Sequence, residues 1–91
     1  MGRAETDITK INEFRFVMEY DFGGDSRFPY TCWIYKKDEK GGYIPFEDKD
    51  GFQVRREFKS NYNKIHYRNF INKFATDENY RNDYINNERD R

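Results

Sequence analysis

The sequence predicts an α+β fold, in which a four-stranded antiparallel β-sheet (a meander) is followed by one or two C-terminal helices packed on one face. Three observations lead to this prediction. Apolar and polar residues alternate over the first two thirds of the chain, the apolar period becomes helical after Ser60, and turn residues separate the apolar segments. Strands followed by helices are typical of the α+β class.

The N-terminal ten residues are polar and show no period. Residues 1–10 are therefore predicted to form a flexible N-terminal arm, and residues 11–91 a single α+β domain. Only one domain is expected, because a second hydrophobic core needs roughly 50 residues of its own.

The first strand is predicted over about residues 12–22, in the stretch FRFVMEYDFGG that begins at Phe14. An aromatic residue or Met stands at each even position up to Phe22, and charged residues hold most of the odd positions. Successive side chains of a strand point to opposite faces of the sheet. We therefore expect the even face to form the core and the odd face to meet solvent.

Three more strands follow in the prediction. Residues 29–37, PYTCWIYKK, form a strand that is apolar on both faces. Residues 43–46 form a short edge strand that contains a proline. Asp50 and Gly51 then predict a hairpin turn, which leads into a fourth strand over residues 52–58.

The helical part of the prediction begins at Ser60, a good N-cap residue. Four apolar residues then recur at i, i+3, i+4 and i+7, the spacing of a helix face that packs on a sheet. They are Tyr67, Phe70, Ile71 and Phe74. Thr76 or Asp77 could cap a second, shorter helix with a narrow apolar strip.

The composition restricts the core and suggests an origin. Aromatic residues make up 20% of the chain and leucine is absent, so the interior must be built mainly from Phe, Tyr and Ile. Nearly half of the residues are Phe, Tyr, Met, Ile, Asn or Lys, whose codons are AT-rich. We interpret this bias as the mark of an AT-rich genome, such as that of a low-GC bacterium, a phage or another mobile element.

The charges limit the classes of partner. With 17 basic and 17 acidic residues and a pI near 6.6, the chain lacks the basic excess typical of duplex-binding proteins. The same balance disfavours an acidic mimic of DNA. The single cysteine, Cys32, cannot form an internal disulfide, and no apolar run approaches 18 residues. A cytoplasmic protein without a membrane span is expected.

No motif for catalysis or metal binding stands out. The segment EDKDG can be aligned with a calcium loop, but Phe46 would occupy the first ligand position, so a hairpin turn is expected instead. One Cys and one His cannot form a four-ligand zinc site. Cys32 is predicted to be a core thiol and not a nucleophile activated by His66. We therefore expect a protein that is not an enzyme, with no cofactor and no metal.

The candidate site is a surface. Trp, Tyr and Arg exposed together are the composition of a protein-binding hot spot and also of a platform on which bases stack. The odd sheet face and the basic residues around it supply such a set. The residues predicted to bind a partner are Arg15, Glu19, Trp33, Tyr35, Arg55, Arg56, Lys64 and Arg68. The alternative is that the N-terminal arm, the second helix or a dimer mate covers Trp33 and Tyr35.

Two functions from different classes fit these features. The first is a non-enzymatic phage or mobile-element protein that binds and inhibits or modulates a host protein or complex, for which anti-CRISPR proteins are one example of the type. It would act as a monomer or homodimer. The alternative is a single-stranded nucleic-acid-binding protein, since four strands followed by a helix is broadly similar to the topology of Pur-type single-strand binders. A small nuclease with scattered acidic and basic residues is a third possibility.

Overall fold

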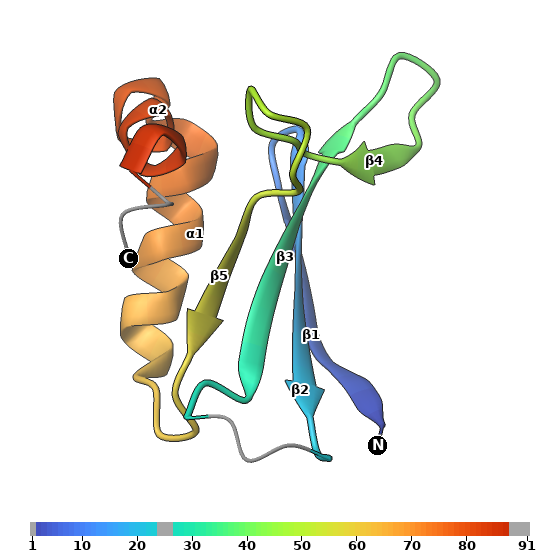
Figure 1. Ribbon diagram of the computed structural model, residues 1–91. Coiled ribbons are helices and arrows are strands. Elements are labelled where there is room, and N and C mark those ends of the chain that lie inside the picture. Colours follow the sequence, from blue (N-terminus) through green and yellow to red (C-terminus); the bar gives the residue numbers. More distant parts are fainter. Residues whose placement is uncertain (1, 24–26, 88–91) are drawn as a thin grey trace.

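The computed structural model describes residues 2–23 and 27–87, and its two layers are one antiparallel sheet and two helices on the same face of that sheet (Figure 1). The predicted α+β class is confirmed, with a fifth strand in addition. The elements are β1 (Arg3–Ile11), β2 (Phe14–Asp21), β3 (Tyr30–Lys37), β4 (Tyr43–Pro45), β5 (Arg55–Phe58), α1 (Lys64–Thr76) and α2 (Glu78–Asn87).

Strand β1 corrects the prediction of a flexible N-terminal arm. From Arg3 onward this segment pairs antiparallel with β2, up to the pair Ile11–Phe14. Residues 6–11 read TDITKI and are rich in the β-branched residues that favour strands. A two-residue turn joins β1 to β2, and its first residue, Asn12, has a φ of 54°, in the left-handed region that Asn tolerates better than most residues. The polar composition of β1 reflects its position at an edge of the sheet.

The sheet runs in the order β1, β2, β3, β4, and β5 also pairs with β3. The two last strands share one edge of β3, because β4 pairs with its C-terminal end and β5 with its N-terminal end. Between them, the two ends of the loop over residues 46–54 meet β3 at Ile34: the amide of Phe46 donates to the Ile34 carbonyl at 3.0 Å, and the Ile34 amide donates to the carbonyl of Val54 at 3.2 Å. The fourth predicted strand therefore begins at Arg55, later than expected.

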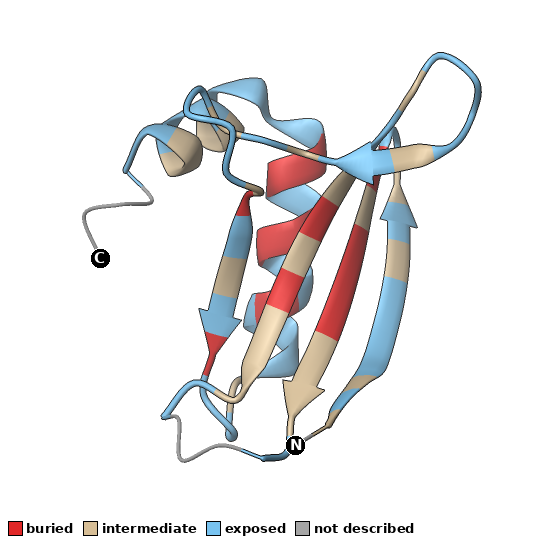
Figure 2. Cartoon of the chain, turned by 45° about the vertical axis from the view of Figure 1, so that its right-hand side comes forward, coloured by how far each residue is buried: buried red, intermediate tan, exposed pale blue. Residues whose placement is uncertain are grey.

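The core lies between the sheet and α1, as the even positions of β2 and the helical stripe predicted (Figure 2). Phe16 and Phe74 are fully buried, and their ring centroids are 5.9 Å apart in an edge-to-face contact. Phe74 makes a similar contact with Phe14 at 5.6 Å. Contacts between rings thus do the packing that leucine does in most small domains.

The helix ends are capped by side chains. The N-cap of α1 is Asn63 and not the predicted Ser60, because the Asn63 Oδ1 accepts from the amides of Ile65 and His66. Asp77 separates the two helices, and its Oδ1 accepts from the amide of Tyr80 at 3.1 Å, which agrees with one of the two predicted caps.

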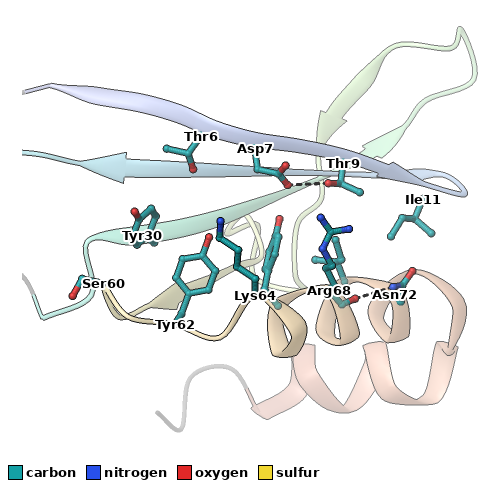
Figure 3. A pocket seen from close by; sticks show the side chains of 12 residues that line it. Thr6, Asp7, Thr9, Ile11, Tyr30, Ser60, Tyr62, Lys64, Arg68 and Asn72 are labelled. Atoms are coloured by element: carbon teal, nitrogen blue, oxygen red, sulfur yellow. Dashed lines mark hydrogen bonds between the residues drawn. The ribbon is translucent and has the colours of Figure 1, made fainter.

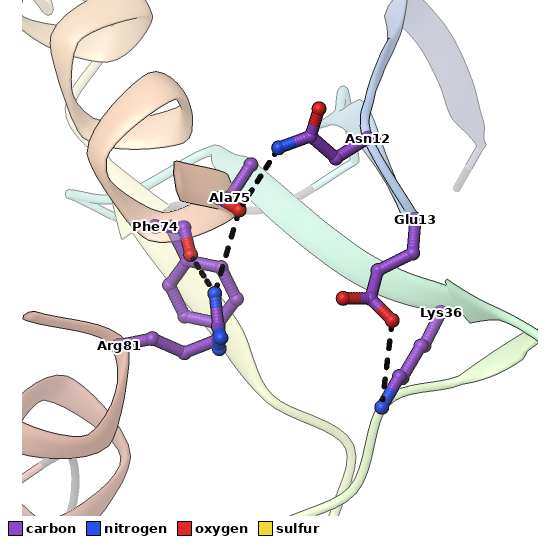
Figure 4. A network of polar contacts seen from close by, with 6 residues as sticks. All are labelled: Asn12, Glu13, Lys36, Phe74, Ala75 and Arg81. Atoms are coloured by element: carbon purple, nitrogen blue, oxygen red, sulfur yellow. Dashed lines mark hydrogen bonds and ion pairs between the residues drawn. The ribbon is translucent and has the colours of Figure 1, made fainter. Parts of the chain in front are cut away.

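The C-terminal carbonyls of α1 are satisfied by two other parts of the fold (Figure 4). Arg81 of α2 donates to the carbonyl of Phe74 at 2.7 Å, and Asn12 from the β1–β2 turn donates to that of Ala75 at 3.4 Å. The last carbonyls of a helix have no partner within the helix. These contacts therefore join the end of α1 to α2 and to the first hairpin.

Candidate functional site

The sheet face opposite the helices, called here the outer face, carries most of the predicted partner-binding residues. Both helices pack on the other face, so neither covers it (Figure 1). Strand pairing brings Arg15 opposite Tyr35, and Trp33 opposite Arg55. Among the predicted residues, the outer face brings together Arg15, Glu19, Trp33, Tyr35 and Arg55.

Arg15 lies between two tyrosine rings at one end of this face. Its guanidinium carbon is 4.9 Å from the ring centroid of Tyr35 and 4.9 Å from that of Tyr43. Its Nε is buried and makes no hydrogen bond to any described residue. The Nζ of Lys10 in β1 also lies 5.4 Å from the ring centroid of Tyr43. This end of the outer face is a packed cation–aromatic cluster, in which two cations share the ring of Tyr43.

Trp33 is fixed at the centre of the outer face. Its indole Nε1 donates to Glu19 Oε1 at 2.9 Å, and the same oxygen lies 3.9 Å from a guanidinium nitrogen of Arg3. The guanidinium of Arg55 is 5.8 Å from the Trp33 ring. These contacts hold the half-buried indole in one orientation.

The other end of the outer face is acidic. Glu5 stands directly opposite Glu19, and Thr31 opposite Glu57. Glu19, Asp21 and Glu57 border a shallow hollow of about 130 Å³, which Arg3 also lines. The outer face therefore carries a basic, aromatic end next to β4 and an acidic end next to the N-terminus of β1.

Three of the predicted partner-binding residues lie elsewhere. Arg56 pairs with Cys32 and points to the helix side, where its guanidinium is 4.6 Å from the ring of Phe70. The cause is the alternation of the strand, which turns Arg56 away from the face used by Arg55. Lys64 and Arg68 are on α1, and they are not part of the outer face.

Lys64 and Arg68 instead line a groove of about 460 Å³ between β1 and α1, called here the edge groove. Both side chains rise from the helix toward the strand, where Asp7 and Thr9 form the opposite wall (Figure 3). Asp7 Oδ2 accepts from the Thr9 hydroxyl at 2.9 Å. Within the described part of the chain, neither Lys64 nor Arg68 forms an ion pair.

Several residues of these two surfaces were missed from the sequence. Lys10, Asp7 and Thr9 belong to the segment expected to be an arm, and Tyr43 belongs to the short strand that was read only as an edge. The sequence did contain a signal for β1, namely the β-branched residues around the alternating segment Ile8, Thr9, Lys10 and Ile11.

Cys32 and Tyr67 form a buried pair beneath the sheet. The Cys32 thiol is fully buried and donates to the Tyr67 hydroxyl at 3.9 Å. Burial raises the pKa of the Cys32 thiol to about 12, and burial together with the nearby thiol raises the pKa of Tyr67. A thiol held in its protonated form is a poor nucleophile, in agreement with the prediction of a core cysteine. His66 is exposed on α1 and is not a packing residue.

The segment EDKDG forms a turn, as predicted. Asp48 Oδ1 accepts from the amides of Asp50 and Phe52, and Gly51 adopts a φ of 85°, which favours glycine. Over residues 2–23 and 27–87, no group of three His, Cys, Asp or Glu side chains is placed to hold a metal ion.

Comparison with known proteins gives no relative for this chain: no protein family, no curated protein and no solved structure matches it. None of the helices in the described ranges is long and apolar enough to cross a membrane. The function is therefore inferred from the geometry of the two surfaces.

Proposed function

We propose that this chain is a small non-enzymatic protein-binding module whose recognition surface is the outer face of its sheet. The observation that carries the proposal is the fixed cation–aromatic arrangement around Trp33 and Arg15, on a face that neither helix covers. Hot spots of protein interfaces are enriched in Trp, Tyr and Arg, and prior ordering of these side chains lowers the entropy cost of binding.

The charge pattern supports a protein partner. One end of the outer face carries cations and the other carries mainly carboxylates, of which Glu19 is paired with Arg3, so a partner with the opposite arrangement is favoured in one orientation. Complementary charge gives specificity and speeds association. The abundance of residues whose codons are AT-rich further suggests that the partner is a host protein bound by a phage or mobile-element protein, for inhibition or modulation in the manner of anti-defence proteins.

The partner can be sought by comparative capture. The wild-type chain and the Trp33→Ala and Arg55→Ala variants are immobilised and exposed to lysates of low-GC bacteria, and bound proteins are quantified by mass spectrometry. The control variant carries Lys40→Gln and Lys49→Gln, which remove two charges from exposed turns away from the outer face. A partner of the outer face is retained by the control and depleted by both outer-face variants.

The purified partner then gives a quantitative test. Trp33→Ala and Arg55→Ala are each expected to leave the chain folded, as judged by circular dichroism, and to weaken binding about fivefold or more, the usual hot-spot threshold of about 1 kcal/mol. Equal affinity of wild type and both variants for every captured protein would reject the outer face as the recognition surface. Unfolding caused by Trp33→Ala would place Trp33 in the core and also reject it.

Single-stranded nucleic acid is the second candidate, because Arg15 stacked between Tyr35 and Tyr43 resembles the way cations and rings combine in base-stacking platforms. The carboxylates at the other end of the outer face would repel a phosphate backbone that extends across it. Titration of a fluorescent oligothymidine at low and high salt separates the two functions. Tight binding that falls steeply with salt would favour nucleic acid, and no binding at low salt would remove this candidate.

A further inference from the structure

We infer that the free edge of β1 and the edge groove form a second docking site, which takes an extended segment of a partner protein with an acidic residue flanked by apolar ones at alternate positions. This site is distinct from the outer face and does not depend on it. The segment would add to the sheet as a strand next to β1.

The first support is the edge itself. In the described part of the chain β1 pairs only with β2, although it is nine residues long. In an antiparallel pair, alternate residues direct their amide and carbonyl groups away from the partner strand. One row of backbone groups of β1 therefore points outward, where an added strand can bond to it.

The second support is that the spacing of side chains along a strand matches the spacing of residues along the neighbouring face of α1. In Figure 3 β1 and α1 run side by side along the groove, with Asp7 and Thr9 above and Lys64 and Arg68 below. Residues four apart on a helix are separated by about 6 Å along its axis, and alternate side chains of a strand by about 6.6 Å. Inward side chains of an added strand can therefore follow the row of helix residues.

The third support is the chemistry along the groove. Tyr30 and Tyr62 line one end, and Ile11 and Ile71 line the other. Between them lie the two cations of α1, against the single carboxylate of Asp7. A docked segment with an apolar, an acidic and an apolar side chain at alternate positions matches this order. Its acidic side chain would lie beside Arg68 and opposite Thr9, away from the carboxylate of Asp7.

The groove's own charges make the site selective. Asp7 points inward from β1, and strand pairing shifts register between Glu5 and Asp7. Inward charges and bulges on an edge strand disfavour indiscriminate pairing. A second copy of β1 would present Asp7, Thr9 and Ile11 at alternate positions, in which the acidic residue is not flanked by two apolar ones, so a segment of different sequence is the better occupant.

The site is tested with a capped peptide, Thr-Val-Thr-Glu-Thr-Val-Thr, titrated into the full-length ¹⁵N-labelled chain and followed by amide chemical shifts. We expect shifts along residues 6–11 and on the adjoining face of α1. Replacing Glu by Gln in the peptide, or combining Lys64→Gln with Arg68→Gln in the protein, should weaken binding about fivefold, as expected for loss of a partly exposed ion pair. Methylating alternate peptide nitrogens should abolish binding, because the added strand loses its backbone hydrogen bonds.

Matched variants separate this site from the outer face. The Lys40→Gln/Lys49→Gln and Trp33→Ala variants should bind the peptide as the wild type does. Any of the following results would overturn the inference: equal affinity for the Glu and Gln peptides, binding of the N-methylated peptide, or shifts confined to the outer face. If acetate alone reproduces the shifts, the groove is a small-anion site and the inference is overturned. If light scattering shows dimerisation through β1, a second copy is the occupant and the inference is likewise overturned.

Discussion

The two faces of the sheet use the same kinds of side chain for different purposes. On the inner face, rings pack against rings, and Phe14, Phe16 and Phe74 are almost completely removed from solvent. On the outer face, rings are half-buried and pack against cations and a carboxylate, as Tyr35 does with Arg15 and Trp33 with Glu19. Strand β2 contributes to both faces through its alternate residues.

This difference teaches that the residues that stabilise the fold and those of the proposed recognition surface are largely separate. Ring contacts in the core remove large apolar areas from water, which is the main source of stability. Contacts between exposed cations and rings contribute about 0.5–1 kcal/mol each. Substitutions on the inner face should therefore change the free energy of unfolding strongly. Those of the partly exposed cations and rings on the outer face should change it weakly, whereas Val17, opposite Trp33 on that face, is buried and not solvated as expected.

The largest effect is expected for Phe74→Ala. Phe74 is fully buried and its ring contacts those of Phe14, Phe16 and Phe46, among others. Its truncation should lower the free energy of unfolding by about 3–5 kcal/mol, measured by urea unfolding followed by circular dichroism. Phe16→Ala and Phe70→Ala should fall in the same range. A loss below about 1 kcal/mol for Phe74→Ala would show that the rings do not hold the two layers together.

Alkaline pH should destabilise the chain through Cys32. Burial raises the pKa of its thiol from the ordinary 9.0 to about 12, so between these values the folded state keeps a proton that the unfolded chain releases. The contribution is fully present below pH 9 and is lost as the pH rises, by up to about 1.4 kcal/mol per unit. The measurement is the free energy of unfolding at pH 8, 9.5 and 10.5, for the wild type and Cys32→Ala.

The control for this prediction is the Cys32→Ala variant, measured at the same pH values as the wild type. Cys32→Ala changes packing equally at every pH, so only the change of its effect with pH counts. If the wild type and Cys32→Ala lose stability in parallel above pH 9, the buried thiol is not the cause. The raised pKa of Tyr67 should add a further loss at higher pH, and this loss should be smaller in Cys32→Ala, where burial still raises that pKa but the thiol no longer does.

A smaller effect is expected where α2 meets the sheet. The hydroxyl of Tyr84 donates to the backbone carbonyl of Arg55 at 2.7 Å. Tyr84→Phe removes this hydrogen bond and keeps the ring, so the free energy of unfolding should fall by about 1 kcal/mol. Hydrogen exchange should rise in α2 more than in α1. An unchanged α2 would mean that its ring contacts alone keep it in place.

The smallest effect is expected for Arg15→Lys on the outer face. A lysine keeps the charge but lacks the planar guanidinium that lies between Tyr35 and Tyr43. The free energy of unfolding should change by less than about 1 kcal/mol, by the same urea titration. A loss as large as that of Phe74→Ala would show that the outer face is a second core and would remove the distinction between the two faces.

Elements defined by local periods were predictable from the sequence. The even residues of β2, the stripe of α1 and the turn at Asp48 each follow from spacing within one segment. Strand β1 was missed because it is an edge strand, solvated on much of its surface, and its strand character depends on pairing with β2. The placement of β5 beside β3 depends on the loop before it, which no local period encodes.

The candidate site was predictable only in part, for the same reason. Arg15, Glu19, Trp33, Tyr35 and Arg55 could be grouped because they alternate along strands that were recognised. The position of Arg56 on the helix side could not be predicted, because the parity of β5 could not be fixed before its start was known. The edge groove could not be foreseen, since one of its walls belongs to β1.

The position of Trp33 has a spectroscopic consequence. It is the only tryptophan in the chain, and its indole lies on the outer face beside a carboxylate, whereas the core is built mainly of phenylalanine. Intrinsic fluorescence excited at the indole band therefore reports on the environment of the outer face and hardly on the core. Emission that changes with a ligand while the far-ultraviolet dichroism does not would identify the outer face as the place of contact, without any label.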